Sequence, residues 1–321
     1  MSAFHAGERA MHERLGIAQR MGEIGPRVIR DHMPDQHRQF YAQLPFVLVG
    51  SVDDALRPWA SLLVGQPGFL GTPDAQHLAS TALPMPGDPL ARHLAPGAAL
   101  GLLGIELPTR RRNRVNGHVA RVDGSGWLLD VEETTGNCPQ YIQQRELTWR
   151  RDPADQQPRA VQPLTALDAE AQALIAGADT LFVASHAHGR SDVSHRGGRA
   201  GFVRVDGPGR LLVPDFSGNL FFMTLGNFVS HPRAGLLFID FERGDLLSLT
   251  GRVELVFDGP DVERLDGAER AWRFELDEGL WLRDALPLGF DFKSWSPRSL
   301  ETGSWTSAAP DQRRSVPPPA R

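Results

Sequence analysis

The sequence predicts a mainly β protein with peripheral helices. The first observation is a series of short apolar runs broken by glycine and proline, which is typical of strands joined by tight turns. The second is that two such series match each other at a nearly constant offset, which indicates a repeated unit. The third is that helical spacing of apolar residues occurs mainly at the N-terminus and in short segments between strands.

The apolar runs form two groups. The first group comprises FVLVGSV, WASLLVG, GAALGLLGIEL, HVARV and GWLLDVEE, between residues 46 and 133. The second group extends from TLFVAS at residue 180 to GRVELVF, which ends at residue 257. Short strands with turns at this spacing favour an antiparallel barrel or sandwich. Closure into a barrel would also protect the sheet edges.

The two groups share ordered blocks of sequence. PWASLLVGQPGFL (58–70) aligns with SDVSHRGGRAGFV (191–203) at an offset of 133 residues. GLLGIELPTRRRNRVNGHV (101–119) aligns with GLLFIDFERGDLLSLTGRV (235–253) at an offset of 134 residues. Agreement of two ordered blocks at almost one offset predicts a tandem duplication of a unit of roughly 110 residues.

The segments outside these groups have a different character. Residues 5–43 carry apolar residues at helical spacing, and Pro34 suits a first helical turn. The polar stretch 150–163 contains prolines and is typical of a linker. A short helix follows it, with Thr165 or Asp168 as the N-cap. We expect the C-terminal RRSVPPPAR to be disordered.

Composition argues against several classes of protein. The chain has 321 residues, of which 41% are apolar and 23% charged, as in globular proteins. No apolar run approaches the roughly 20 residues of a membrane span, and the charged N-terminus does not resemble a secretory signal. A net charge of −5 gives no support for nucleic-acid binding. The single cysteine, Cys138, excludes an internal disulfide framework, so we expect a cytoplasmic protein without membrane or nucleic-acid partners.

The basic residues limit how the protein can bind phosphate. Lys293 is the only lysine among 34 basic residues, a bias typical of GC-rich bacterial genomes. Any phosphate must therefore be held by arginine or by backbone N–H groups. Neither a dinucleotide-binding G-x-G-x-x-G after a strand nor a G-x-x-x-x-G-K-[ST] is present, so NAD(P)H would dock only transiently.

Several motifs together resemble a known family. DVSHRGGRAGFVRV (192–205), LLVPDFSGN (211–219) and TLGNFVSHPRAGLLFIDF (224–241) resemble the FMN-binding split barrels of the pyridoxamine 5′-phosphate oxidase-like superfamily. The first copy and NCPQYIQQR (137–145) are similar to its larger tandem members. The resemblance implies two tandem Greek-key split β-barrels that form an intramolecular pseudo-dimer, with FMN in the groove between them. The protein would then be a monomer or a homodimer.

On this basis the chain divides into five parts. They are an N-terminal helical segment (1–43), a first split barrel (44–149), a linker with a helix (150–178), a second split barrel (179–258), and a C-terminal strap with a disordered tail (259–321).

The resemblance also implies the residues that bind the cofactor. Arg196 is the expected phosphate partner, assisted by Ser194 and by backbone N–H groups at Gly197, while the strand that carries His195 contributes to the flavin ring. The remaining candidates are Asp215 and Asn219 before the second-copy helix, and Ser61, Arg112 and Asn116 from the first copy. Asp215 and Asn219 could instead cap the helix, and Arg112 and Asn116 could belong to a solvated turn.

The sequence departs from the family in two places. Leu220 and Phe221 stand where members usually carry a basic residue after the asparagine. The first copy has no arginine at the position that matches Arg196, so we expect one good site, built on the second copy.

The resemblance implies an FMN-dependent oxidoreductase that uses NAD(P)H or another small electron donor. Its substrate and catalytic residue are not indicated by the sequence, and pyridoxamine phosphate oxidation itself is disfavoured because no second phosphate site can be matched. A flavin-nucleotide carrier or sensor without turnover, or a haem-binding relative of the same barrel, are the alternatives. His186 and His188 faintly resemble a metallohydrolase pattern, but Arg190 and Ser191 interrupt it, so we expect no metal site. Cys138 has no dedicated base nearby and is interpreted as an inert thiol.

Overall fold

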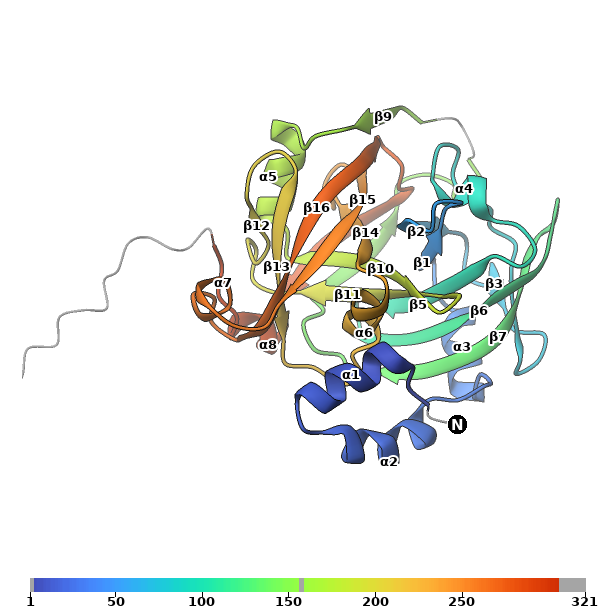
Figure 1. Ribbon diagram of the computed structural model, residues 1–321. Coiled ribbons are helices and arrows are strands. Elements are labelled where there is room, and N and C mark those ends of the chain that lie inside the picture. The colour runs from blue at the N-terminus through green and yellow to red at the C-terminus, as the bar shows by residue number, and fades with distance from the viewer. Residues whose placement is uncertain (1–2, 156–158, 306–321) are drawn as a thin grey trace, which may run out of the picture.

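The structure is a computed structural model that describes residues 3–155 and 159–305. It consists of two large antiparallel sheets and a small two-stranded one, with helices at their periphery (Figure 1). The mainly β architecture is therefore as expected. The C-terminal tail that we expect to be disordered lies outside the described residues. No helix in the described ranges is long and apolar enough to span a membrane.

Three helices precede the first sheet: α1 (Ala6–Arg14), α2 (Ala18–Val28) and α3 (Asp35–Ala42). Helix α1 begins with a capping box, in which His5 accepts a hydrogen bond from the backbone of the first turn and Glu8 accepts one from the backbone N–H of His5. This helix packs on α6 of the second half, far away in sequence (Figure 1). The N-terminal segment thus connects the two halves of the chain.

The first sheet has seven strands in the order β2-β1-β5-β6-β7-β4-β3. Their bounds are β1 (Phe46–Val52), β2 (Pro58–Val64), β3 (Leu70–Gly71), β4 (His77–Ser80), β5 (Ala99–Glu106), β6 (Arg111–Asp123) and β7 (Gly126–Asn137), with α4 (Leu90–His93) between β4 and β5.

The second sheet has the order β11-β10-β14-β15-β16-β13-β12, and β9 pairs additionally with β16. The bounds are β9 (Val161–Leu164), β10 (Thr180–Ala187), β11 (Arg190–Gly197), β12 (Arg204–Val205), β13 (Arg210–Phe216), β14 (Arg233–Ile239), β15 (Leu246–Val256) and β16 (Ala268–Leu282). The helices of this half are α5 (Ala169–Gly177), α6 (Met223–Ser230) and α7 (Pro260–Glu263).

The two sheets have the same strand order, because adding nine to each label of the first sheet gives the order of the second. Helix α4 and helix α6 occupy the same place in the two sequences of elements. The pairing register agrees as well: Val49 faces Ser61 in the first sheet, and Val183 faces Ser194 in the second. The sequence blocks that match each other therefore form matching strands.

Neither sheet closes into a ring of hydrogen-bonded strands within the described parts of the chain. One edge of each sheet is instead covered by the other sheet, since β11 contacts β5 and β2 contacts β14. Covering an edge with another element removes the hazard of an exposed edge strand as effectively as closure does. Both sheets are therefore open. The barrel closure expected from the sequence is not observed in the hydrogen bonds between the described strands.

Two glycines allow this close approach of the sheets. A Cβ built on Gly101 of β5 would lie 2.5 Å from the Cα of Asp192 in β11. A Cβ built on Gly235 of β14 would lie 2.7 Å from the Cα of Trp59 in β2. Only glycine, which lacks a Cβ, permits backbones to approach so closely.

The core consists of three main apolar clusters. One lies within the first sheet and includes Trp127, and another lies within the second sheet and includes Trp272. The third is shared by both sheets and contains Phe46 and Leu62 of the first and Phe182 of the second. The shared cluster makes the two halves a single packed body.

The C-terminal part differs from the expected boundaries. Strand β16 lies inside the second sheet between β15 and β13, although the sequence division ends that unit at residue 258. The aligned blocks end at residue 253, so the repeat gave no signal for this strand. The remaining strap pairs β17 (Leu288–Ser294) with β8 (Gln144–Trp149) and ends in α8 (Pro297–Leu300).

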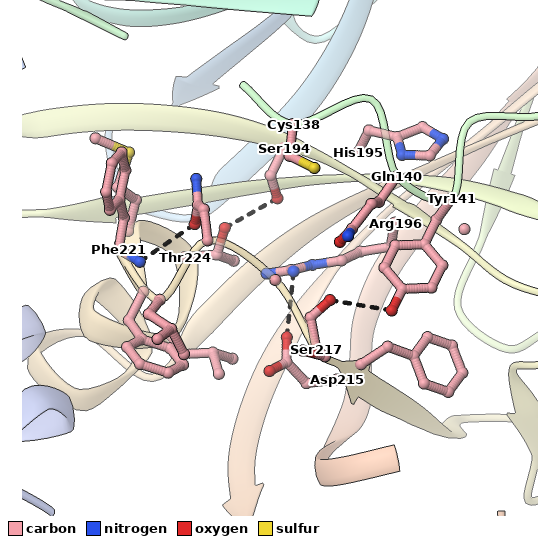
Figure 2. Close-up of a pocket in the computed structure, with 18 of the residues that line it drawn as sticks. Cys138, Gln140, Tyr141, Ser194, His195, Arg196, Asp215, Ser217, Phe221 and Thr224 are labelled. Carbon is pink, nitrogen blue, oxygen red and sulfur yellow. Dashed lines mark hydrogen bonds and ion pairs between the residues drawn. The ribbon is translucent and has the colours of Figure 1, made fainter. Parts of the chain in front are cut away.

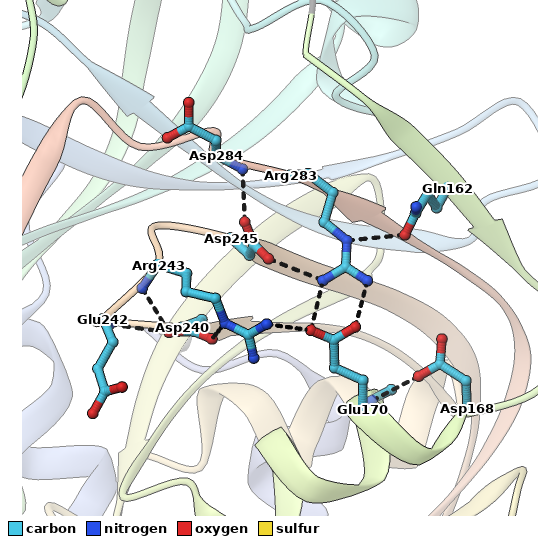
Figure 3. Close-up of polar contacts among 10 residues, drawn as sticks. Gln162, Asp168, Glu170, Asp240, Glu242, Arg243, Asp245, Arg283 and Asp284 are labelled. Carbon is cyan, nitrogen blue, oxygen red and sulfur yellow. Dashed lines mark hydrogen bonds and ion pairs between the residues drawn. The ribbon is translucent and has the colours of Figure 1, made fainter.

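Helix α5, in the segment expected to be a linker, is fixed by a polar network (Figure 3). Its N-cap is Asp168, one of the two predicted caps, which accepts the N–H of Ala171 at 2.7 Å. Glu170 forms a bidentate pair with Arg283, and Arg283 also binds Asp245 at 2.9 Å. These contacts join the helix to the second sheet at the ends of β15 and β16.

Candidate functional site

A cavity lies where the two halves meet, and we call it the Arg196 cavity (Figure 2). Arg196 and Ser194 of β11, Asp215 of β13 and Thr224 of α6 line it from the second half. Arg112 of β6 and Tyr141, from the segment between β7 and β8, line it from the first half. The volume open to the centre of a water molecule is about 100 Å³.

Arg196 and Asp215 form an ion pair inside this cavity. The Nη1 atom of Arg196 lies 3.2 Å from Oδ1 of Asp215, and Arg270 of β16 lies 2.7 Å from the other carboxylate oxygen. Asp215 is 4% exposed. The Nε atom of Arg196 is buried and has no hydrogen-bond partner among the described residues. One guanidinium donor is therefore free to bind a ligand.

Arg112 reaches the cavity from the first sheet. Its Nε donates to the carbonyl oxygen of Cys138 at 2.7 Å, and its Nη1 lies 3.3 Å from Nδ1 of His195. No carboxylate pairs with it in the parts of the chain that the structure describes. Burial, together with the nearby charges of Arg114 and Arg196, lowers the pKa of Arg112 to about 9. The group is still a cation at neutral pH.

His195 carries an orphaned donor. Burial lowers its pKa well below 6.5, and the nearby arginines add to the effect, so the ring is neutral at neutral pH. An arginine N–H can only donate, so Nδ1 accepts from Arg112 and the ring proton is assigned to Nε2. The Nε2 atom is buried without a partner among the described residues.

The loop before α6 has an unusual backbone. Leu220 and Phe222 have φ values of 64° and 58°, which place both in the left-handed region that non-glycine residues rarely adopt. Asn219 supports this turn by accepting the N–H of Phe221 at 3.2 Å. The loop brings the first turn of α6 to the cavity, where its backbone N–H groups have no partners within the helix.

Small and aromatic residues complete the walls. The hydroxyl of Thr224 donates to that of Ser194 at 2.9 Å. A Cβ on Gly197 would collide with the carbonyl oxygen of Tyr141, so glycine is required at this point. Tyr141 donates its hydroxyl to the carbonyl of Ser217 at 3.0 Å and stacks on Phe216 at a centroid distance of 5.6 Å (Figure 2).

Seven of the nine sequence candidates line this cavity. They are Arg112, Ser194, His195, Arg196, Gly197, Asp215 and Asn219. Asp215 forms an ion pair with Arg196 and does not cap α6, whose N-cap is Phe222. Asn219 stabilises the turn that precedes this helix.

The other two candidates lie elsewhere. Ser61 is fully buried and donates to Oδ1 of Asp88 at 2.5 Å, and burial raises the pKa of Asp88 to about 6. Leu62 and Leu63 follow it, buried, where the second copy has His195 and Arg196. Asn116 lines a separate cavity, which is described below.

Other lining residues were not among the candidates, and three of them make polar contacts described above. Arg270 lies beyond the predicted end of the second unit, so sequence reasoning did not connect it with Asp215. Thr224 is the first residue of TLGNFVSHPRAGLLFIDF, which contributed to the family resemblance without a role for that residue. Tyr141 lies in NCPQYIQQR, which contributed to the family resemblance without a role for each residue.

The described residues contain no group of three or more histidine, cysteine, aspartate or glutamate side chains that could hold a metal ion. His186 lies on β10 and contacts the hydroxyl of Ser191 at 3.2 Å, while His188 lies in the turn after that strand. Cys138 is partly buried and lines the Arg196 cavity.

Comparison with known proteins gives weak structural likenesses. No model of a known protein family matches the chain, and no curated protein matches it. Solved structures that align include HupZ from Group A Streptococcus, with 16% identity over 34% of this chain and 89% of that one and a TM-score of 0.29. An FAD-binding protein from Mesorhizobium loti aligns with 14% identity over 38% of this chain and 96% of its own, at a TM-score of 0.29. The FAD-binding protein from Mycobacterium smegmatis gives 17% identity, 37% and 99% coverage, and a TM-score of 0.26.

Each of these three structures aligns with little more than a third of this chain. At such TM-scores the alignments do not decide between functions.

Proposed function

We propose that the protein binds flavin mononucleotide, with the phosphate in the Arg196 cavity, and that it is an FMN-dependent oxidoreductase. The observation that carries the proposal is the convergence of Arg112 and Arg196 from different sheets on one cavity. Arg112 faces no carboxylate in the described structure, and Arg196 has a free Nε. Two such groups suit a phosphate dianion, which arginine binds through charge-assisted hydrogen bonds.

The charge balance of the cavity also favours an anion. Four guanidinium groups, of Arg112, Arg114, Arg196 and Arg270, face three carboxylates, of Asp192, Asp215 and Glu269. The first turn of α6 supplies further N–H donors without acceptors in the helix. A buried excess of donors is costly unless an acceptor is bound.

The size of the cavity limits what it can enclose. A volume of about 100 Å³ matches the phosphate end of a nucleotide and is smaller than the 300–1,000 Å³ of sites that enclose whole ligands. A flavin ring would therefore extend past the mouth, where Tyr141 and Phe216 present a stacked aromatic surface. When bound, the flavin would supply the hydride and electron chemistry, and the chain would anchor and orient it.

We further propose that the two sheets arose by tandem duplication and form a pseudo-dimer with one functional site. The common strand order supports this, as does the pair of glycine contacts. Gly101 and Gly235 are equivalent in the repeat, and so are their partners Asp192 and Trp59, as a two-fold relationship requires. The buried Leu62 and Leu63 argue for a filled second site.

A haem is less well supported than a flavin at this cavity. An axial histidine must offer a nitrogen lone pair to iron, but Nδ1 of His195 already accepts from Arg112, and Nε2 carries the proton. The same cavity is compatible with a flavin carrier or sensor that has no turnover. Only a turnover measurement distinguishes that function from an enzyme.

The first experiment is the absorbance spectrum of the full chain purified without added cofactor. A flavin spectrum that bleaches with NADH or NADPH supports the enzyme, whereas a flavin spectrum that does not bleach supports the carrier or sensor. A Soret band would replace the flavin proposal with haem.

The second experiment is FMN titration of the apo-protein. We expect Arg196→Ala to weaken binding by about 2–4 kcal/mol, which is roughly 30- to 900-fold in Kd. Arg112→Ala should weaken binding in the same direction. Arg210→Ala, on the exposed start of β13, is the control and should leave Kd unchanged. Unchanged Kd values for both Arg196→Ala and Arg112→Ala would refute the phosphate assignment.

A further inference from the structure

A second cavity lies beside the Arg196 cavity, and we call it the Glu8 cavity. Its volume open to water centres is about 410 Å³. His5 and Glu8 of the N-terminal segment, Asn116 and Glu133 of the first sheet, and Asp192 and Arg190 of β11 line it. Met223 lines both cavities, and the Arg114–Asp192 ion pair of 3.0 Å separates them.

The walls of the Glu8 cavity carry acceptors without donors. Asp192 is 3% exposed and Asn116 is 8% exposed. The Oδ2 atom of Asp192 and the Oδ1 atom of Asn116 are buried and have no hydrogen-bond partner within residues 3–155 and 159–305. When the aspartate is ionised, both atoms can accept hydrogen bonds but cannot donate them. Buried acceptors of this kind are satisfied by a ligand that brings N–H groups.

Three carboxyls and two guanidinium groups line the cavity: Glu8, Glu133 and Asp192 with Arg9 and Arg190. Arg114 does not line it but pairs with Asp192, so Glu8 and Glu133 are the carboxyls left to balance the charge of a ligand. Arg9 donates to the carbonyl of Phe4 at 2.7 Å, and Arg190 lies 3.5 Å from Glu133. The positive groups inside the cavity are therefore already engaged.

The pKa values of the wall residues reflect their burial and their charged neighbours. Burial, and then the nearby carboxyls of Glu133 and Asp192, raise the pKa of Glu8 to about 8. Burial and Asp192 raise the pKa of Glu133 to about 7. Burial and the neighbouring His188 lower the pKa of His5 to about 4, so His5 contributes no charge at neutral pH. Burial is the largest cause of each shift, so a charged side chain in this cavity is poorly solvated.

We propose that the Glu8 cavity is a binding site for a small organic cation with N–H donors, such as an ammonium or amidinium group. Asn116 and Asp192 would accept from the ligand, and Glu8 and Glu133 would balance its charge. This site is distinct from the proposed flavin site, and it does not depend on flavin binding.

Isothermal titration calorimetry of the full chain at pH 7.5 tests the proposal with three ligands of nearly the same shape. Benzamidinium carries a positive charge and N–H donors, benzamide is neutral, and benzoate is an anion. We expect benzamidinium to bind at least tenfold more tightly than benzamide, and benzoate not to bind. Benzamidinium should also release up to about one proton, because a cation lowers the pKa values of Glu8 and Glu133. The release is obtained by repeating the titration in two buffers of different ionisation enthalpy.

Substitutions at single residues test whether benzamidinium binds in the Glu8 cavity. Glu133→Gln should weaken benzamidinium binding at least tenfold, and Glu8→Gln should weaken it and reduce the proton release. Glu132→Gln is the matched control, because its exposed side chain is the neighbour of Glu133 but does not line the cavity. Circular dichroism confirms that each variant is folded.

Equal binding of benzamidinium and benzoate, or no binding of benzamidinium at millimolar concentration, overturns the proposal. Competition between FMN and benzamidinium also overturns it, because the cavity would then belong to the flavin site. Benzamidinium binding to a protein that does not bind FMN would leave this proposal standing while the proposed function fails.

Discussion

Gly226 of α6 lies directly against Glu8 of α1. A Cβ built on Gly226 would be 2.7 Å from the backbone nitrogen of Glu8 and 2.6 Å from its Cγ. A Cβ built on Gly7 would collide with the carbonyl oxygen of Gly226. This contact between two helices holds Glu8 at the Glu8 cavity and fixes the N-terminal segment on the second half of the chain.

We predict that Gly226→Ala destabilises the protein by about 1–3 kcal/mol, the usual cost of overpacking. Alanine is favoured over glycine in a helix by about 1 kcal/mol, so the clash with Glu8 must exceed that gain. Gly22→Ala in α2 is the control, because its Cβ would meet nothing within 4 Å and should stabilise the protein. Urea unfolding measures both. A stabilised Gly226→Ala variant would show that α1 is not held by this contact.

The approach of the two sheets gives a second prediction. Gly235→Ala places a Cβ 2.7 Å from the Cα of Trp59, and Gly101→Ala places one 2.5 Å from that of Asp192. Backbone atoms cannot rotate away as a side chain can, so we expect each variant to lose about 2 kcal/mol or more of unfolding free energy.

Because the two glycine contacts are equivalent, the two losses should be similar. Gly124→Ala, whose Cβ would have open space, serves as the control. Thermal or urea unfolding that leaves both Gly101→Ala and Gly235→Ala as stable as the control would contradict the close packing of the sheets.

The sequence predicted the parts of the fold that repeat. The blocks containing Ser61 and Ser194 matched by spacing alone, and the structure gives both serines the same register in the same strand. Strand β16 was missed because the second copy of that strand shares no recognisable block with the first, so its place depends on pairing across the sheet. Pairing between distant strands leaves little trace in a local pattern.

The candidate site was predicted where one strand carries it. Ser194, His195, Arg196 and Gly197 are consecutive, so a single motif identified them together. Arg270 reaches Asp215 only through the pairing of β13 with β16, which brings residues 55 positions apart into contact. The Glu8 cavity joins residues of the N-terminus to both sheets, and no spacing rule links Glu8 to Asp192.

The raised pKa of Glu8 predicts how stability depends on pH. Its pKa rises from 4.5 to about 8 on folding, so between these values the folded state holds a proton that the unfolded state has released. The free energy of unfolding therefore falls as the pH rises through this window, by up to about 1.4 kcal/mol per pH unit. Burial is the largest cause of the shift; the carboxyls of Glu133 and Asp192 add to it, and the hydrogen bond from His5 and the charge of Arg114 oppose it.

Glu8→Gln should remove this decrease of the unfolding free energy with rising pH. Glutamine can still accept the N–H of His5 in the capping box, so the variant should match the parent near pH 4.5 and exceed it in stability above pH 8. Glu13→Gln, on the exposed face of the same helix, should follow the parent at every pH. Urea unfolding at pH 5, 7 and 9 measures the difference, and parallel curves for Glu8→Gln and the parent would exclude a buried proton on Glu8.

The network around Arg283 gives the last prediction (Figure 3). Asp245 is 6% exposed and accepts from both Arg283 and the backbone N–H of Asp284, at 2.9 and 2.6 Å. Asp245→Ala removes the acceptor of that N–H and the buried carboxylate that pairs with Arg283, and should destabilise the protein by about 1–3 kcal/mol. Glu170→Ala removes partly exposed pairs with Arg283 and Arg243 and should cost less than about 1 kcal/mol.

Urea unfolding measures the free energy lost in each variant. Comparing the two losses shows whether the buried Asp245 or the partly exposed Glu170 contributes more to stability. Glu242→Ala is the control, since its exposed side chain lies beside the same network and should change stability by no more than about 0.5 kcal/mol. A larger loss for Glu170→Ala than for Asp245→Ala would mean that the docking of α5 depends on the charge pair with Arg283. The expected order instead assigns the stability of this corner to the buried carboxylate that joins β15 to the chain after β16.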